Sequence, residues 1–311
     1  MAAPEPQPYN LPENAVWLIT GCSSGMGQGL AQYIASKKPS QRVVATARNP
    51  SSLSEIPDGP NVLKLPLDVT SVSSIDTAFS TTLSRFGRVD VVVNNAGYNL
   101  MGDTESSPPG NPGARALLDT NFWGAVDVSK RALQVFREAN PTTGQRGGVI
   151  VNISSLGGYL GSAGNAFYHA SKFALEGFAE SLAKEVFPEW NIHICNVEPG
   201  GVKTNYTTSS LQRLPRHPAY DRPDGATTAM LAFMDTPALH AGFAGADEVA
   251  ERIYAVVGSG KRIPIRVPLG KDSWGMVMAE TERVKEELEE WREFSCAMGN
   301  PEVESMAKLV K

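Results

Sequence analysis

The chain has 311 residues, of which 41% are hydrophobic and 20% charged, with 28 Lys and Arg against 33 Asp and Glu and a formal net charge of -5. This composition excludes a disordered or fibrous protein, and the negative charge disfavours nucleic acid and anionic membrane surfaces as partners. The three cysteines and four histidines lie far apart and lack metal-ligand spacing, so no disulfide framework and no metal site are expected.

Three parts are expected along the chain. Residues 1–13, which are rich in Pro, predict a flexible N-terminal tail, residues 14–270 a single domain, and residues 271–311 a C-terminal helical extension. The start of the chain resembles neither a signal peptide nor a transit peptide, and no apolar run approaches roughly 18 residues. We therefore expect a cytoplasmic protein with reduced thiols and no membrane span.

From residue 16, short apolar runs alternate with helical patterns, which is typical of βαβ units. Strands are predicted at 16–20, 42–46, 62–65, 89–93, 149–153, 192–197 and 263–267, and helices at 26–37, 72–86, 113–139, 168–187 and 247–257. This order predicts a Rossmann-type α/β fold, a doubly wound parallel seven-stranded sheet with helices on both faces. Ligands of such sheets bind outside the carboxyl ends of the strands.

Two segments depart from this alternation. Between residues 201 and 245 the periodicity weakens and Pro, Gly, Thr and His accumulate, which indicates a substrate loop or an elaborate surface connection. After Gly270, the residues Val277, Val284, Leu288 and Trp291 share one stripe of an acidic helical pattern. We expect this helix to pack on its own domain; an oligomer contact and a cover over the active site stay open.

The first predicted strand runs into a glycine-rich turn, Thr20–Gly27, followed by a helical pattern. Glycines let the backbone turn sharply and approach a pyrophosphate, while the helix N-terminus offers unpaired N–H groups. A cofactor phosphate is therefore expected to lie at this turn. The residues concerned are Gly21, Ser23, Ser24, Gly25, Met26 and Gly27.

With its TGxxxGxG pattern, this segment resembles the compact branch of the short-chain dehydrogenases/reductases, and the resemblance extends over about residues 14–270. It implies that Asp68 and Val69 contact the adenine and that Asn95, Ala96 and Gly97 support the cofactor pocket. It also implies that the segment 199–204 contacts the nicotinamide end of the cofactor. Within that segment the residues singled out are Pro199, Gly200, Val202 and Thr204.

The end of the second predicted strand bears on the choice of cofactor. An NAD enzyme holds the ribose hydroxyls there with Asp or Glu, but this chain has no acid and places Arg48 close by. A guanidinium can pair with a 2′-phosphate. We therefore expect NADP(H) to be preferred over NAD(H), with an ordinary surface role for Arg48 as the alternative.

The same resemblance implies the catalytic residues: Asn121 before the fifth predicted strand, and Ser155, Tyr168 and Lys172 after it. Tyr168 and Lys172 are four residues apart and thus share one helix face, where an ammonium lowers the pKa of a phenol. Tyr168 can then act as general acid or base. The family resemblance implies that Lys172 also holds the nicotinamide ribose, that Ser155 rather than Ser154 binds the substrate oxygen, and that Asn121 supports a proton relay.

We interpret the chain as an oxidoreductase that interconverts a carbonyl and a secondary alcohol. Its expected substrate is a bulky, lipophilic small molecule, because apolar and aromatic residues such as Tyr98, Leu156, Phe167 and parts of the 206–243 loop should line the pocket. By resemblance, a homodimer or homotetramer is expected, through the long helices that contain Asn121 and Tyr168. Three alternatives remain: a catalytically silent NADP(H)-binding protein, a non-redox enzyme of the same fold, and an interaction protein built around the acidic C-terminal helix.

Overall fold

One parallel sheet of seven strands forms the centre of the structure, a computed structural model that describes residues 8–108, 112–204 and 211–299. Its spatial order is β11-β7-β6-β4-β1-β2-β3, so the chain reverses its direction of winding between β1 and β4. The predicted doubly wound α/β fold is confirmed. The strands are β1 Val16–Ile19, β2 Arg42–Ala47, β3 Val62–Pro66, β4 Val91–Asn94, β6 Gly148–Ile153, β7 Ile192–Pro199 and β11 Arg266–Leu269.

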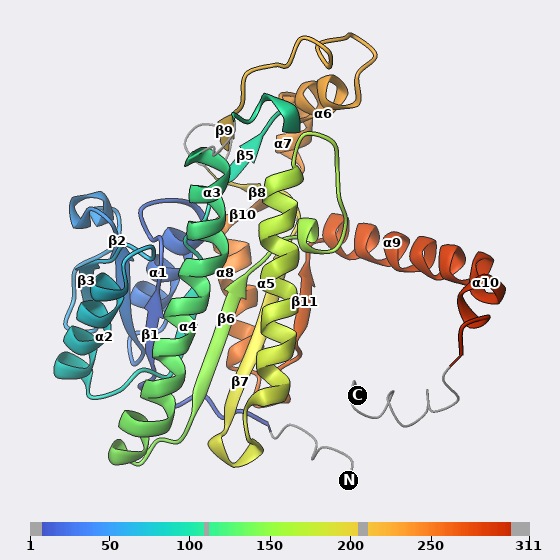
Figure 1. Cartoon of the computed structure of the whole chain (residues 1–311). Helices are drawn as coiled ribbons and strands as arrows, with labels where there is room; N and C mark the ends of the chain where they lie inside the picture. Colours follow the sequence, from blue (N-terminus) through green and yellow to red (C-terminus); the bar gives the residue numbers. More distant parts are fainter. Residues whose placement is uncertain (1–7, 109–111, 205–210, 300–311) are drawn as a thin grey trace.

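Helices cover both faces of this sheet (Figure 1). On one face lie α1 Gly25–Lys37 and α8 Ala246–Val257, and on the other α2 Val72–Phe86, α4 Gly124–Gln134 and α5 Ala166–Glu185. Each face encloses its own apolar core, and this is why β1, β4, β6 and β7 are buried along their whole length. The sheet is therefore a rigid scaffold that fixes the positions of the residues at the ends of its strands.

The long helix expected at 113–139 is interrupted. It consists of α3 Pro112–Leu118, a π-helical turn Asp119–Trp123, α4 and a second π-helical turn Val135–Ala139. π turns are common at functional sites, since the extra residue redirects nearby side chains. The first of them contains Asn121.

The segment predicted as a loop at 201–245 contains short elements that close over the carboxyl ends of the strands. These are β8 Val202–Lys203, β9 Leu211–Arg213, α6 Ala226–Met234, α7 Pro237–Ala241 and β10 Ala244–Gly245. β8 pairs with β10, and β9 pairs with β5 Asn99–Met101. The buried Asp103 carboxylate accepts from Arg216 Nε at 2.8 Å and from the backbone N–H of His217 at 3.0 Å, which ties the segment down. Tyr206, expected near the substrate, lies outside the described residues.

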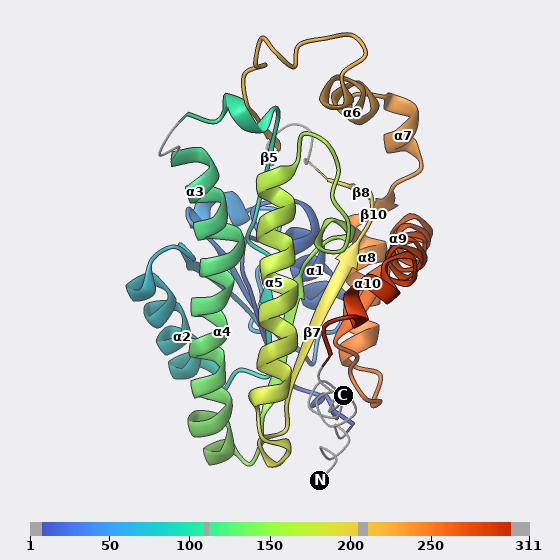
Figure 2. The ribbon, with the colours of Figure 1, turned by 45° about the vertical axis from the view of Figure 1, so that its right-hand side comes forward.

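The last strand and the C-terminal helix differ from expectation. β11 begins at Arg266, three residues after the predicted start, because Ile263 packs into the core unpaired and Pro264 lacks an N–H for the ladder. Only the first turns of α9 Lys271–Glu290 pack on the domain, through Ser273 and Val277. From Thr281 onward each residue is exposed as far as Gly299, and α9 and α10 Arg292–Cys296 project away from the sheet (Figures 1 and 2).

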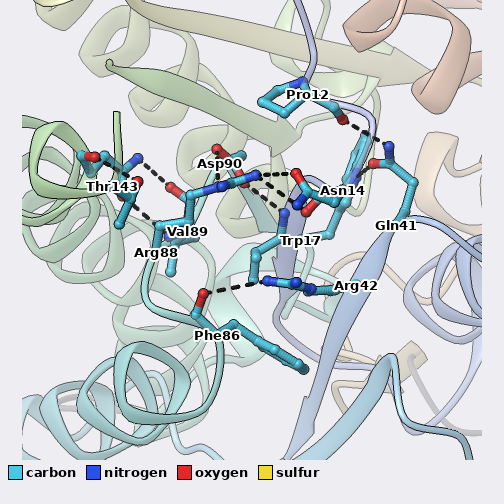
Figure 3. A network of polar contacts seen from close by, with 12 residues as sticks. Pro12, Asn14, Trp17, Gln41, Arg42, Phe86, Arg88, Val89, Asp90 and Thr143 are labelled. Atoms are coloured by element: carbon cyan, nitrogen blue, oxygen red, sulfur yellow. Dashed lines mark hydrogen bonds and ion pairs between the residues drawn. The ribbon is translucent and has the colours of Figure 1, made fainter. Parts of the chain in front are cut away.

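At the amino ends of the strands, residues 8–14 lie against the domain rather than in a tail. Tyr9 is fully buried, with its hydroxyl donating to the carbonyl of Asp90 at 3.5 Å. The Asp90 carboxylate accepts from the backbone N–H of Val16 at 2.7 Å and from Arg88 Nε at 2.9 Å. Arg88 in turn donates to Asn14, so one polar network joins the N-terminal segment to the sheet (Figure 3).

Candidate active site

A cavity of about 700 Å³ opens at the carboxyl ends of β1, β2, β4 and β6, where the order of the strands reverses. This is the place where ligands of doubly wound sheets bind. Most of the residues predicted from sequence line it: Gly21, Ser23, Ser24, Gly25, Met26, Arg48, Asp68, Val69, Asn95, Ala96, Gly97, Tyr168, Lys172 and Thr204. Those that lie behind or beside the lining are Gly27, Asn121, Ser155, Pro199, Gly200 and Val202.

The glycine-rich turn forms one wall of the cavity. Gly21 and Gly25 have φ values of +70° and +61°, a conformation that favours glycine. Gly27 lets α1 approach the turn, since a Cβ there would lie 2.6 Å from the carbonyl oxygen of Gly21. Ser24 makes no side-chain cap at the start of α1, so the leading N–H groups of this helix are open to an anionic ligand.

Thr20 and Asn95 brace this turn against the end of β4. Thr20 Oγ1 accepts from the backbone N–H groups of Asn95 and Ala96 at 2.9 and 3.0 Å. Asn95 Nδ2 donates back to the carbonyls of Thr20 and Gly21 at 2.8 and 3.0 Å. These four bonds couple two walls of the cavity, so Asn95 supports the turn as well as lining the cavity.

The far end of the cavity carries the groups expected at an adenosine. β2 ends at Ala47, no acid follows it, and Arg48 lines the cavity. Opposite it, Asp68 accepts from the N–H and hydroxyl of Thr70 at 2.9 and 2.7 Å. These bonds, with a smaller contribution from Arg48, lower the pKa of Asp68. One cationic group and one carboxylate therefore lie at this end of the cavity.

Tyr168 and Lys172 meet at the opposite end, on the first two turns of α5. The Lys172 ammonium lies 5.7 Å from the centre of the Tyr168 ring and donates to the carbonyl of Ile153 at 2.8 Å. Burial lowers the pKa of Lys172 to about 8, against which Glu176 acts to raise it. A cation is thus held beside a phenol that faces the cavity.

The two serines at the end of β6 point to different places. Ser155 Oγ accepts from the backbone N–H of Gly157 at 3.0 Å and caps the 3-10 turn Leu156–Gly158. Ser154 is buried, with its hydroxyl oxygen beside the carboxyl group of Glu176. Ser154 lines the cavity and Ser155 stands at its edge.

Asn121 lies behind the cavity wall. Its Oδ1 accepts from the N–H of Tyr98 at 3.0 Å, and its Nδ2 donates to the carbonyl of Tyr98 at 2.9 Å and to Ser171 Oγ at 3.2 Å. Ser171 directly precedes Lys172 in α5. The π turn therefore links α5 to the segment after β4.

The segment 199–204 continues β7 towards the cavity, and only Thr204 reaches the lining. Gly200 donates its N–H to the carbonyl of Leu269 at 3.0 Å, and Gly201 donates to Asp272 at 2.7 Å. Val202 packs against the core below α1. Pro199, Gly200 and Val202 lie beside the lining, and their contact with the nicotinamide end of a cofactor stays a prediction.

Sequence reasoning missed two buried acids next to this site. Glu176 lies one helical turn beyond Lys172, and Glu198 lies near the end of β7. Burial raises the pKa of both carboxyl groups, that of Glu198 to about 8. The four-residue spacing between Lys172 and Glu176 could have indicated that Glu176 lies next to the lysine. No sequence pattern places Glu198 next to Glu176.

Apolar side chains gather beside Tyr98, at the end of the cavity near Tyr168. The cluster consists of Leu100, Ala114 and Leu117, with Tyr98, Leu118, Phe167 and Leu214 packed against it. Among the described residues there is no group of three His, Cys, Asp or Glu that could hold a metal ion. Nor does any helix within those ranges combine the length and apolar character needed to cross a membrane.

Comparisons with known proteins agree with this geometry. The family model for short chain dehydrogenases matches residues 15–214. The chain is 43% identical to the oxidoreductase calM of Penicillium decumbens over 295 residues, 93% of this chain and 95% of the relative. It is 39% identical to a 3-ketodihydrosphingosine reductase of Bacteroides thetaiotaomicron, over 61% of this chain and 65% of that protein. A crystal structure of a short-chain dehydrogenase from Streptomyces avermitilis superposes with a TM-score of 0.77 at 31% identity, covering 91% and 99% of the two chains.

Proposed function

The chain belongs to the short-chain dehydrogenase family, and we propose that it is an NADP(H)-dependent carbonyl reductase or secondary alcohol dehydrogenase for a lipophilic substrate. The observation that carries the proposal is the meeting of Tyr168 and Lys172 at one end of a cavity whose other end holds the glycine-rich turn and Arg48. A nicotinamide cofactor bound there would supply or accept the hydride. The residues of the protein would orient the substrate and transfer the proton.

Tyr168 is the proposed proton donor to the substrate oxygen in reduction and the acceptor in oxidation. Lys172 is proposed to favour the ionised phenol through its charge and to hold a ribose hydroxyl of the cofactor. Ser155, at the cavity edge, is proposed to donate its hydroxyl hydrogen to the reacting oxygen while its Oγ accepts from the N–H of Gly157. Asn121 is proposed to support a proton relay from the side of Ser171 and Lys172.

Two observations support a lipophilic ketone or secondary alcohol. Tyr98, which lines the cavity, packs with the half-buried Phe167 and Leu214 against an apolar cluster. The similar reductase of Bacteroides thetaiotaomicron is named for 3-ketodihydrosphingosine. Burying apolar substrate surface there contributes roughly 25 cal/mol per Å².

An oligomer formed through α4 and α5 is proposed in addition. Trp123, at the start of α4, and Phe173, on the outer side of α5, are 55% and 46% exposed although both are large and apolar. A second copy packing there would cover both rings. Light scattering of the purified protein distinguishes a monomer from this assembly.

The test is NADPH oxidation with a panel of bulky apolar ketones and small polar carbonyls, using Tyr168→Phe as the matched control because it removes one hydroxyl. Turnover of the apolar ketones should fall about 10²- to 10⁴-fold in the variant, the size of a lost general acid. Equal rates for both proteins would overturn the proposed mechanism. Tight NADPH binding without turnover of any compound would favour the silent-binding or non-redox alternative.

Cofactor preference is tested with Arg48→Ala. The variant should lose about 10- to 100-fold in kcat/KM with NADPH, the size of a charge-assisted hydrogen bond, while the value with NADH changes little. The NADH assay controls for damage to the fold. Equal losses with both cofactors, or a native preference for NADH, would contradict the proposal.

A further inference from the structure

Two carboxyl groups are buried in contact with each other behind the catalytic lysine. Glu176 is 4% exposed and Glu198 is fully buried. Glu198 shares one face of β7 with Asn196, whose side chain bonds to Glu176, so the two carboxyl groups are close enough to interact. Within the described residues, no hydrogen bond reaches Oε1 of Glu176 or either carboxyl oxygen of Glu198; the Ser154 hydroxyl, which also has no partner there, lies beside Glu176. Two ionised carboxylates in this position would repel at close range, whereas one proton between them supplies the missing donor.

A ladder of three asparagine side chains ends at this pair and shows which carboxyl oxygen accepts its last hydrogen bond. Asn94 Nδ2 donates to Asn152 Oδ1 at 2.8 Å, Asn152 donates to Asn196 at 3.0 Å, and Asn196 donates to Oε2 of Glu176 at 2.6 Å. Ser129 Oγ donates to the carbonyl of Ala125 at 2.7 Å and therefore accepts from Asn94 Nδ2 at 2.9 Å, which fixes the orientation of the ladder. Oε2 of Glu176 is the acceptor at its end and also lies 3.5 Å from Arg266 Nε, a cation that favours the negative charge on Glu176 and leaves the proton to Glu198.

The charges around the pair agree with one negative charge on it. On α5, Lys172 and Glu180 face it; on β11, Arg266 lies 3.5 Å from Glu176 and also bonds to Glu180. Glu180 is also paired with Lys184 at 2.8 Å, so its charge is compensated without Lys172. Tyr159 and Cys195, whose pKa values are raised by burial, add no charge at neutral pH. Ionising Glu198 as well would bury a second anion, whose oxygens accept no hydrogen bond from the described residues.

We propose that Glu176 and Glu198 share one proton, carried by Glu198, and that the ionised Glu176 is a positioning residue that keeps Lys172 protonated in the working pH range. Its consequence for catalysis rests on the proposed function, but the proton sharing does not. Glu176 lies one helical turn from Lys172, so its carboxylate opposes the burial that drives the lysine to release its proton. Lys172 then remains a cation beside Tyr168.

The first test compares pH profiles of kcat/KM for ketone reduction. Glu176→Gln removes the negative charge, so the falling limb at high pH should move down by about one unit, while rates below that limb stay within about twofold of wild type. Glu198→Gln keeps an N–H donor in place of the acid proton and should retain the wild-type limb. Glu180→Gln makes the same charge change one turn further along α5 and should also leave the limb in place.

Either of two results would overturn the proposal. A shifted limb in Glu198→Gln with an unchanged one in Glu176→Gln would place the charge on the other acid. A uniform loss of rate in Glu176→Gln, with no shift of the limb, would make the carboxyl group a purely structural part of the core.

The second test needs no turnover and so separates this inference from the proposed function. Because the pKa of Glu198 is raised in the folded protein, its protonation stabilises the fold at low pH, and this stabilisation is lost as pH rises from about 4.5 to about 8. The melting temperature of wild type should therefore fall more steeply over that range than that of Glu198→Gln. Parallel curves would show that the pair holds no proton. This comparison uses Glu198→Gln alone and decides the point even if Glu176→Gln fails to fold.

Discussion

His169, the residue after Tyr168, anchors the segment that follows Ser155. Its Nδ1 lies 2.8 Å from the carbonyl of Gly157, and its Nε2 lies 3.0 Å from the backbone N–H of Ser162. Because the carbonyl only accepts and the N–H only donates, Nδ1 carries the proton and the ring is neutral. Burial lowers the pKa of His169, which also favours the neutral ring.

Replacing His169 by Ala leaves the Gly157 carbonyl and the Ser162 N–H without a partner. Each such group costs about 1–3 kcal/mol when buried, so we expect a loss of about 2–5 kcal/mol in the free energy of unfolding. Since the segment 156–165 joins Ser155 to the start of α5, a small displacement should also lower kcat/KM about 10- to 100-fold.

The same substitution should alter the pH dependence of stability. A histidine whose folded pKa is lowered stabilises the protein above its unfolded value of about 6.5, and this contribution is lost as pH falls below that value. Urea denaturation at several pH values should therefore show a flatter acid limb for His169→Ala than for wild type.

His193→Ala is the matched control. His193 is also buried, with a pKa lowered to about 4 by desolvation, but it lies at the amino end of β7 and bonds to Asn191. This control should lose stability while kcat/KM stays near wild type. If His169→Ala destabilised the protein without affecting kcat/KM, the anchoring role would be refuted.

Two further substitutions test the cavity and the opposite, amino end of the sheet independently of each other. Gly27→Ala forces a Cβ towards the Gly21 carbonyl and the Asn95 side chain, so the affinity for NADPH, measured by fluorescence titration, should fall at least about tenfold. An unchanged affinity would mean that the turn can shift to accommodate the methyl group. Asp90→Ala removes the acceptor that Val16 and Arg88 share at the amino ends of the strands (Figure 3). The free energy of unfolding should fall by about 3–5 kcal/mol while kcat/KM stays near wild type. A large loss of kcat/KM would show that the two ends of the sheet are not independent.

Local patterns were sufficient to predict the elements and most of the cavity. Apolar runs located all seven strands, since strands covered on both faces must be continuously apolar, and the glycine spacing located the turn before α1. Arg48 was found from its place after the second strand, and Tyr168 and Lys172 from the family resemblance; the structure brings all three to one cavity.

The errors arose where tertiary packing outweighed local pattern. The stripe of Val284, Leu288 and Trp291 predicts burial, yet α9 runs past the edge of the domain surface, so the stripe stays exposed. Tyr9 lies in a Pro-rich stretch that predicts a tail, yet its ring fills a site against His193 that no local pattern reveals. The π turn at Asn121 is likewise invisible to a periodicity of 3.6 residues.

The amide ladder shows what strand register adds to sequence. β4, β6 and β7 each carry an Asn in an apolar run, which in isolation predicts nothing more than a strand end. In the sheet Asn94 pairs with Asn152 and Asn152 with Asn196, so the three amides align in one row across the strands. That row must end on an acceptor, and the acceptor it reaches is Glu176, one turn from Lys172. The register of three strands therefore brings a hydrogen-bond donor to Glu176, the acid one turn from Lys172.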